Sequence, residues 1–162
     1  GFHLQEDVSK PMIFVSAGTG FAPMRAFLWE RLALKRAGTP LSEAVLFNGI
    51  RSTAVDFIYR DEIEWFVSEG VLDGVHVATS REDPARREYV QDLLLAQSNR
   101  VWRLLEDGAY VYVCGSQQMR DGVRAAFVDL IAEHASLPRE RAESVLLELE
   151  TVDNRYRPDL WG

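Results

Sequence analysis

Short apolar segments alternate with longer amphipathic segments along the chain. The short segments are rich in β-branched and aromatic residues and apolar on both faces, as buried parallel strands are. They span residues 11–17, 44–50, 74–79 and 109–115. In the longer segments apolar residues recur at helical spacing, and three of these segments end on a glycine suited to a helix C-terminus. This pattern predicts helices over residues 22–38, 55–70, 89–108, 117–134 and 137–151.

The alternation of strand and helix predicts right-handed βαβ units. The fold class is therefore α/β, with a doubly wound, mainly parallel sheet that carries helices on both faces. The final segment, residues 155–162, is short and aromatic. It adds a fifth strand at the edge of the sheet or returns as a tail to the mouth of the sheet. Ligands of such sheets bind beyond the carboxyl ends of the strands, so functional residues are expected directly after each strand.

Composition narrows the function classes. The 162 residues, 47% of them hydrophobic, are expected to form one domain over residues 1–162. The net charge of −7 argues against nucleic acid as a partner, so a bound anion needs a local basic pocket. A single cysteine excludes an internal disulfide framework, and no metal site is predicted. With no apolar run of about 20 residues and no secretory signal, we expect a cytoplasmic location and no membrane contact by this chain.

The loop after the first strand carries little side chain. Residues 15–23 read VSAGTGFAP, so the chain enters the next helix through Gly18, Thr19 and Gly20. Bare backbone there lets a pyrophosphate approach the amide groups of a helix N-terminus. Pro23 then begins the helix where no amide donor is needed. The alternative is a tight turn that binds no ligand, because an isolated G-x-G is a weak signal.

Two common nucleotide-binding motifs are absent. The sequence has no G-x-x-x-x-G-K-[ST] loop. A NAD-type Rossmann fingerprint adds a third small residue and an acidic residue at the end of the second strand. That strand instead ends FNGIR, with Asn48 and Arg51. The sequence therefore disfavours an ordinary NAD-type Rossmann domain.

The end of the third strand carries hydroxyl and basic side chains. Ser80 and Arg81 end the strand, and Arg86, Arg87 and Tyr89 lead into the next helix. A hydroxyl, guanidinium groups and a phenol fit a phosphate dianion beside an aromatic plane, as in the 2′-phosphate and adenine of NADP. The alternative is a solvated loop in which the acidic residues at positions 82, 83 and 88 neutralise the arginines.

Several motifs occur together in a fixed order: AGTGFAP, SRED followed by RREYVQ, YVYVCG and the terminal RYRPDLWG. With them the chain resembles the NADPH-binding domain of the ferredoxin-NADP reductase superfamily. More narrowly, it resembles the diflavin branch, which includes cytochrome P450 reductase and the reductase halves of self-sufficient P450 fusions. The likeness covers nearly the whole chain and implies a Rossmann-like domain of the type found at the C-terminus of ferredoxin-NADP reductase.

The resemblance implies which residues hold NADP(H). The pyrophosphate and nicotinamide loop is matched by Gly18, Thr19, Gly20 and Pro23. Arg51 matches a basic residue aimed at the cofactor phosphates. The 2′-phosphate clamp is matched by Ser80, Arg81, Arg87 and Tyr89. Adjacent cofactor contacts are implied for Gln91, Gly115 and Met119.

The resemblance also implies the catalytic groups. Cys114 matches a cysteine beside C4 of the nicotinamide, where positive charge develops as hydride leaves. Asp159 matches a carboxylate that works with this cysteine and stabilises that charge. Trp161 matches an aromatic residue that stacks on the flavin. In one departure from the family pattern, Ser116 stands where many relatives have an acidic residue.

The resemblance further implies a longer parent protein. An FAD-binding barrel and an FMN-binding domain would lie upstream, and 162 residues cannot hold them as well. FAD and FMN are therefore expected in the parent protein and not in this chain. The expected partners are the FAD domain, which Trp161 would contact, the FMN domain and a haem domain such as a P450. The chain is then a fragment of an NADPH-haemoprotein reductase, expected to be inactive without its FAD domain.

Other functions remain open at this point. The chain could come from another FAD-dependent reductase, of the sulfite reductase or nitric oxide synthase type. A non-catalytic NADP(H)-sensing module would use the same turn and clamp without needing a terminal aromatic residue. A conventional NAD-linked dehydrogenase would need a catalytic side chain in a cleft, and His3, His76 and His134 lie in no such motif.

Overall fold

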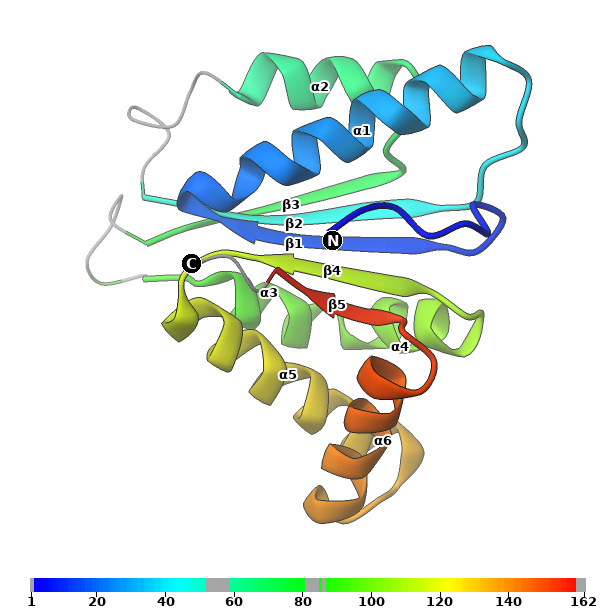
Figure 1. Cartoon of the computed structure of the whole chain (residues 1–162). Coiled ribbons are helices and arrows are strands. Elements are labelled where there is room, and N and C mark those ends of the chain that lie inside the picture. The colour runs from blue at the N-terminus through cyan, green and yellow to red at the C-terminus, as the bar shows by residue number, and fades with distance from the viewer. Residues whose placement is uncertain (1, 52–58, 81–84, 86, 160–162) are drawn as a thin grey trace.

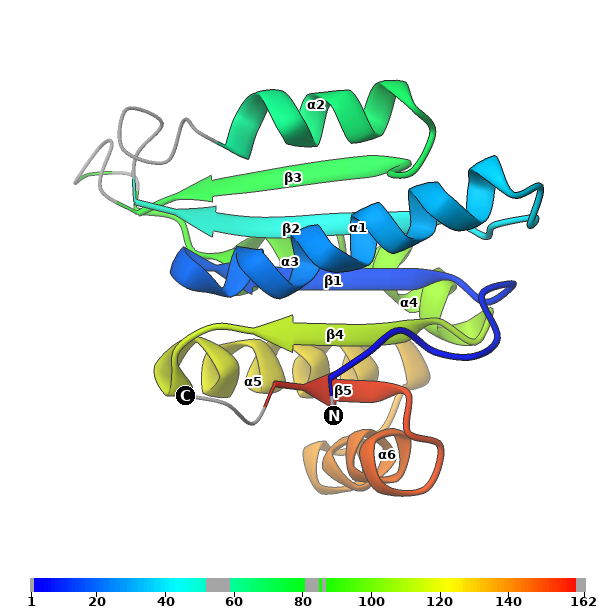
Figure 2. The ribbon, with the colours of Figure 1, turned by 45° about the horizontal axis from the view of Figure 1, so that its top comes forward.

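The computed structural model describes residues 2–51, 59–80, 85 and 87–159, in which five parallel strands form one sheet. The strands are β1 (Met12–Ala17), β2 (Ala44–Ile50), β3 (Gly74–Thr79), β4 (Tyr110–Cys114) and β5 (Tyr156–Pro158). Their order is β3-β2-β1-β4-β5, as Figure 2 shows. The chain therefore reverses its direction across the sheet between β3 and β4, and the switch point lies between β1 and β4. The predicted fold class is confirmed, with a sheet that is wholly parallel.

Helices cover both faces of the sheet (Figure 1). On one face lie α1 (Phe21–Arg36) and α2 (Arg60–Ser68). On the other lie α3 (Val90–Ala96), α4 (Ser98–Glu106) and α5 (Gln117–Ala135). The last helix, α6 (Arg139–Thr151), packs on the outside of α5. Among the described residues, no helix is long and apolar enough to span a membrane.

Alternate strand residues enter two separate cores, one on each side of the sheet. Ile13, Val15 and Phe47 belong to the core beneath α3, α4 and α5. Phe14 and Tyr112 belong to the core beneath α1 and α2. Burial on both faces fixes the strand register, because a slip of one residue would exchange the two sets of side chains. The residues that follow each strand are therefore held at one common edge of the sheet.

One predicted helix differs from the structure, and one open alternative is decided by it. The helix expected over residues 89–108 is broken at Gln97 into α3 and α4. The residues after the break, Ser98 and Asn99, are weak helix formers because their side chains compete for backbone hydrogen bonds. The C-terminal segment forms the short edge strand β5, one of the two arrangements that the sequence left open.

The N-terminal segment, residues 2–5, was not predicted to take part in the fold. Leu4 and Gln5 are buried, and the Tyr112 hydroxyl accepts a hydrogen bond from the Gln5 backbone N–H at 2.7 Å. Phe2 packs on Phe27 and on Tyr112, with ring centroids 5.2 and 5.9 Å apart. This segment lies beside β4 and β5 on the face that carries α1 (Figure 2).

Candidate functional site

A cleft of about 670 Å³ opens at the carboxyl edge of the sheet, where the loops after β1, β2, β3 and β4 converge. The residues predicted for cofactor binding that line it are Gly18, Thr19, Arg51, Ser80, Tyr89, Gln91 and Met119. The structure thus brings together residues that follow four separate strands. The cleft lies where a doubly wound sheet binds its ligand.

The glycine turn forms a short 3₁₀ helix, η1 (Gly18–Gly20), directly before α1. Gly18 has a φ of +57°, in the left-handed region that favours glycine. Gly20 lies against the end of β4, where an added Cβ would stand 2.1 Å from the Cys114 carbonyl oxygen. No side chain caps the start of α1. The turn therefore presents backbone to the cleft, as a pyrophosphate requires, and Pro23 follows in the first turn of α1.

The end of β2 offers no acidic group to a ribose. Asn48 is 5% exposed, and its Oδ1 accepts a hydrogen bond from the buried Ser16 hydroxyl at 3.0 Å. Arg51 is exposed and lines the cleft. This edge thus carries a cation where a NAD-type site would place a carboxylate.

The end of β3 carries the candidate 2′-phosphate site. Ser80 is held by a hydrogen bond from its backbone N–H to the Ile50 carbonyl oxygen at 3.0 Å. Tyr89 is 47% exposed at the start of α3, where its N–H donates to Asp92 Oδ2 at 2.8 Å. Ser80 and Tyr89 thus contribute a hydroxyl and an aromatic ring to one wall of the cleft.

The charges near this wall are not paired with each other. Arg87 and Glu88 are both exposed, and neither forms an ion pair within the described part of the chain. Neutralisation of Arg87 by Glu88, part of the solvated-loop alternative, therefore gains no support. Arg81 and Arg86, together with the acidic residues at positions 82 and 83, lie outside the described residues.

On the far side of the glycine turn, a thiol meets a carboxylate. Cys114 Sγ donates a hydrogen bond to Asp159 Oδ2 at 3.1 Å, and both residues are buried. The Asp159 backbone is held by its N–H, which donates to the Val113 carbonyl oxygen at 2.8 Å, and by Arg120, which donates to its carbonyl. Trp161 lies outside the described residues. The pair adjoins the cleft through Gly20, which contacts the Cys114 carbonyl.

The Cys114 thiol is a neutral donor. Burial raises its pKa to about 12, and the hydrogen bond to Asp159 and the Asp159 charge act in the same direction. A thiol kept protonated in this way does not act as a nucleophile. The arrangement instead offers a polarisable S–H group with a carboxylate behind it, which suits contact with a cationic ring.

The loop after Cys114 is fixed by contacts of Gly115 and Ser116 with Met119. The Ser116 hydroxyl accepts a hydrogen bond from the Met119 N–H at 3.2 Å and caps α5. An added Cβ on Gly115 would stand 2.8 Å from Met119 Sδ. Gln91, from α3, lies against Gly122 of α5, with its Nε2 2.9 Å from the position of an added Cβ. These contacts hold Met119 and Gln91 in the cleft wall.

Sequence reasoning assigned no cofactor contact to several residues that line the cleft, among them Tyr59, Glu88 and Gln118. Glu88 stands between two predicted ligands and Gln118 beside a third, so position alone could have drawn attention to them. Tyr59 carries no such signal, because the fold alone brings it to the cleft, where it packs on Phe21 with ring centroids 4.8 Å apart.

Candidate groups for other chemistry lie elsewhere. His3, His76 and His134 do not line the cleft. His76 stacks on Phe47 and His134 on Trp102, with ring centroids 4.9 and 5.9 Å apart. Within the described ranges, no three His, Cys, Asp or Glu residues gather in a way that could hold a metal ion.

The raised pKa of Cys114 predicts a change of stability at alkaline pH. From its ordinary value of 9.0 up to about 12, the unfolded chain loses the thiol proton while the folded chain keeps it. The free energy of unfolding should therefore fall as pH rises through this window, by up to about 1.4 kcal/mol per pH unit. Urea unfolding at a series of pH values from 8 to about 10.5 measures this decrease in the free energy of unfolding.

A matched variant isolates this contribution from other groups. Burial also raises the pKa of Tyr112, to about 12, so tyrosine adds to the alkaline loss of stability. Cys114→Ala keeps the contributions of all other titrating groups, so the difference between the two curves belongs to the thiol. Parallel curves for the wild type and Cys114→Ala would contradict the buried, carboxylate-bonded thiol.

Comparison with known proteins adds the family. Residues 14–125 match the family model described as "Oxidoreductase NAD-binding domain". The chain belongs to this family. The matched span begins in β1 and ends in α5, so it contains the glycine turn, all the predicted clamp residues and Cys114.

Individual relatives of this oxidoreductase domain agree with the resemblance drawn from the motifs. The chain is 38% identical to NADPH–cytochrome P450 reductase of Oryctolagus cuniculus and 36% identical to that of Homo sapiens, over 99% of the chain and 24% of each relative. It is 40% identical to the sulfite reductase [NADPH] flavoprotein alpha-component of Mannheimia succiniciproducens, over 99% of the chain and 26% of that protein. The chain thus spans about a quarter of the length of these relatives, and the predicted resemblance to a diflavin reductase domain is confirmed.

Proposed function

We propose that this chain binds NADPH and presents its nicotinamide for hydride transfer to FAD in a larger diflavin reductase. In that parent protein, electrons would pass through FMN to a haem acceptor such as a P450. The chain would be the NADP(H)-binding domain over residues 1–162, located in the cytoplasm, with its FAD, FMN and haem domains as partners. The observation that carries the proposal is the Cys114–Asp159 pair, held across Gly20 from a cleft that the exposed Arg51 lines.

The residues of the cleft fit NADP(H). The nicotinamide supplies the hydride and the flavin receives it. At one end of the cleft, Ser80, Arg87 and Tyr89 would hold the 2′-phosphate and the adenine, together with Arg81. Because the chain has a net charge of −7, a phosphate dianion needs local guanidinium and hydroxyl groups to bind it.

The middle of the site would hold the pyrophosphate. The backbone of Gly18, Thr19 and Gly20 leads into the uncapped start of α1, where amide groups favour an anion. Arg51 adds a positive charge to the lining of the cleft. The cleft wall is completed by Gln91 and Met119.

The catalytic end would be formed by the C-terminus of β4 and the segment after β5. Positive charge on the nicotinamide ring would be stabilised by Asp159, whose carboxylate is fixed through the Cys114 S–H. Cys114 would contact the nicotinamide ring with a neutral sulfur, whose polarisability lets it accommodate the positive charge that develops on the ring. Trp161 would cover the flavin ring in the parent protein.

A second acceptor system has its own support. The identity to a sulfite reductase flavoprotein component is as high as that to the P450 reductases. The same domain could therefore serve a reductase whose final acceptor is a sulfite-reducing haemoprotein. The residues of this chain would perform the same steps in both cases, so the two differ only in what lies downstream of FMN.

The isolated chain should bind NADP⁺ but not oxidise NADPH. Purified protein is expected to be colourless and to show no turnover with ferricyanide or cytochrome c, because hydride has no flavin to reach. In the longer protein with its FAD domain, NADPH should bleach the flavin absorbance in a stopped-flow experiment, and Asp159→Asn should slow that step. NADPH oxidation by flavin-free protein would contradict the proposal. So would a rate of flavin reduction that Asp159→Asn leaves unchanged.

A further inference from the structure

Arg157 forms an unusual set of contacts in the edge strand β5. Its Nε donates to the Asn154 carbonyl oxygen at 2.7 Å, and its Nη1 donates to the His3 carbonyl oxygen at 3.1 Å. The guanidinium carbon also lies over the rings of Tyr110 and Tyr112, 5.0 and 5.8 Å from their centroids. One side chain thus joins the N-terminal segment, β4 and the turn before β5.

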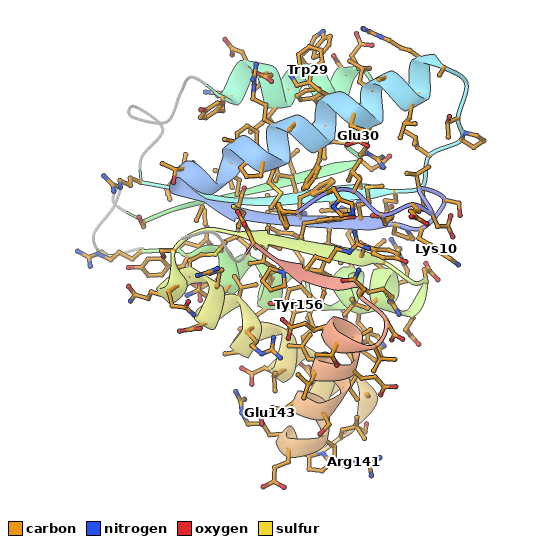
Figure 3. All side chains as sticks on the ribbon, in the orientation of Figure 1. Lys10, Trp29, Glu30, Arg141, Glu143 and Tyr156 are labelled. Carbon is orange, nitrogen blue, oxygen red and sulfur yellow. The ribbon has the colours of Figure 1, made fainter. Side chains whose placement is uncertain are left out.

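The neighbouring residue shows which way Arg157 points. Tyr156 packs edge-on against Phe127 of α5, with ring centroids 5.5 Å apart, and its side chain lies on the α5 and α6 side of β5 (Figure 3). Successive residues of a strand point to opposite faces, so Arg157 and Asp159 share the other face. On that face the N-terminal segment is anchored by Phe2 and Gln5 against Tyr112.

The position of Asp159 depends on a short strand. β5 has three residues and lies at the edge of the sheet, where it pairs with β4 on one side. Strands this short contribute few ladder hydrogen bonds, so side-chain contacts decide how firmly they are held. Arg157 lies only two residues before Asp159, and its contacts hold β5 on the same face as Asp159. From the other side, Arg120 of α5 holds the Asp159 carbonyl.

We propose that Arg157 is a positioning residue: by fastening β5 to the N-terminal segment and to Tyr110 and Tyr112, it fixes the Asp159 carboxylate against the Cys114 thiol. Its effect on hydride transfer rests on the proposed function. Its effect on the Cys114–Asp159 contact does not, because that contact exists in this chain alone.

The test observes this hydrogen bond directly. Cys114 is the only cysteine in the sequence, so the S–H stretching band in a Raman spectrum of the chain is a single band. Asp159→Asn replaces the carboxylate acceptor by a weaker amide and should move the band to higher frequency. Arg157→Ala should move it in the same direction by at least half as much. Arg157→Lys, which keeps a cation over the two rings, should fall between Arg157→Ala and the wild type.

Arg155 supplies the matched control. It stands next to β5 and donates to the carbonyl oxygens of Ala109 at 3.0 Å and of Leu105 at 2.6 Å, and within the described residues its side chain forms no hydrogen bond to the N-terminal segment. Arg155→Ala should lose stability in urea without moving the S–H band. An unmoved band in Arg157→Ala, or an equal shift in Arg155→Ala, would overturn the proposal.

A second readout separates positioning from loosening of the fold. At pH 9, Arg157→Ala should speed alkylation of Cys114 about three- to tenfold, because a thiol that loses its carboxylate partner ionises more readily. In the Asp159→Asn background, Arg157→Ala should add nothing. If the two effects multiply instead, Arg157 acts by opening the structure and the proposal is wrong. No cofactor enters either measurement, so failure of the proposed function would leave this test intact.

Discussion

Arg87→Ala should weaken binding of NADP⁺ by about ten- to a hundredfold and leave binding of NAD⁺ within about twofold. A charge-assisted hydrogen bond to phosphate is worth roughly 1.5 to 3 kcal/mol, and NAD⁺ lacks the 2′-phosphate that would receive it. Arg87 is exposed and forms no ion pair within the described part of the chain, so its charge is available to the ligand. Calorimetry with both dinucleotides at low ionic strength measures the two affinities.

Three further variants sharpen this measurement. Arg87→Lys keeps the charge and should retain most of the affinity, whereas Ser80→Ala removes one hydrogen bond from an uncharged donor and should cost about fivefold. Arg141→Ala removes the same charge at the far end of α6, distant from the cleft (Figure 3), and should change NADP⁺ affinity by less than about twofold. Equal affinity of the wild type for NADP⁺ and NAD⁺ would exclude the 2′-phosphate assignment of Ser80 and Arg87.

The fold followed from local pattern because both faces of the sheet are buried. In β1 and β4 nearly every residue is apolar, and this identifies a strand covered on both sides. The break at Gln97 could not be predicted in the same way, because apolar spacing continues from α3 into α4. The N-terminal segment gave no pattern either, since Phe2 and Leu4 are too few to define a period and are fixed by tertiary contacts.

The candidate site was predictable to the extent that it lies directly after strands. The glycine turn, Arg51 and Ser80 all follow a strand end, so topology alone places them at one edge. The contact between Cys114 and Asp159 joins residues 45 positions apart, and no spacing rule connects them. Only the family pattern paired them, and only the structure shows that Arg157 and the N-terminal segment hold the strand that precedes Asp159.

Gly20→Ala should lower the free energy of unfolding by about 3 kcal/mol, more than Gly18→Ala, the replacement of the other glycine in the turn. The cause is steric and not conformational. Gly20 has φ −66° and ψ −8°, which alanine adopts without strain. Its added Cβ, however, would stand 2.1 Å from the Cys114 carbonyl oxygen and 2.6 Å from the carbonyl carbon, both backbone atoms of a buried strand. Either α1 or the end of β4 must therefore move.

Gly18→Ala is the matched control, because the two glycines have opposite constraints. Gly18 has a φ of +57° but no atom within 4 Å of an added Cβ, so alanine there costs only the left-handed conformation, about 1 to 2 kcal/mol. Urea unfolding measures the free energy of unfolding of both variants. The two losses can be compared directly if the dependence of that free energy on urea concentration is the same in both proteins. The movement forced by Gly20→Ala should also weaken NADP⁺ binding and shift the Cys114 S–H band, since Gly20 lies between the cleft and that thiol. A Gly20→Ala protein as stable as Gly18→Ala would mean that the turn does not press against β4, and the link from the phosphate loop to the Cys114–Asp159 pair would be lost.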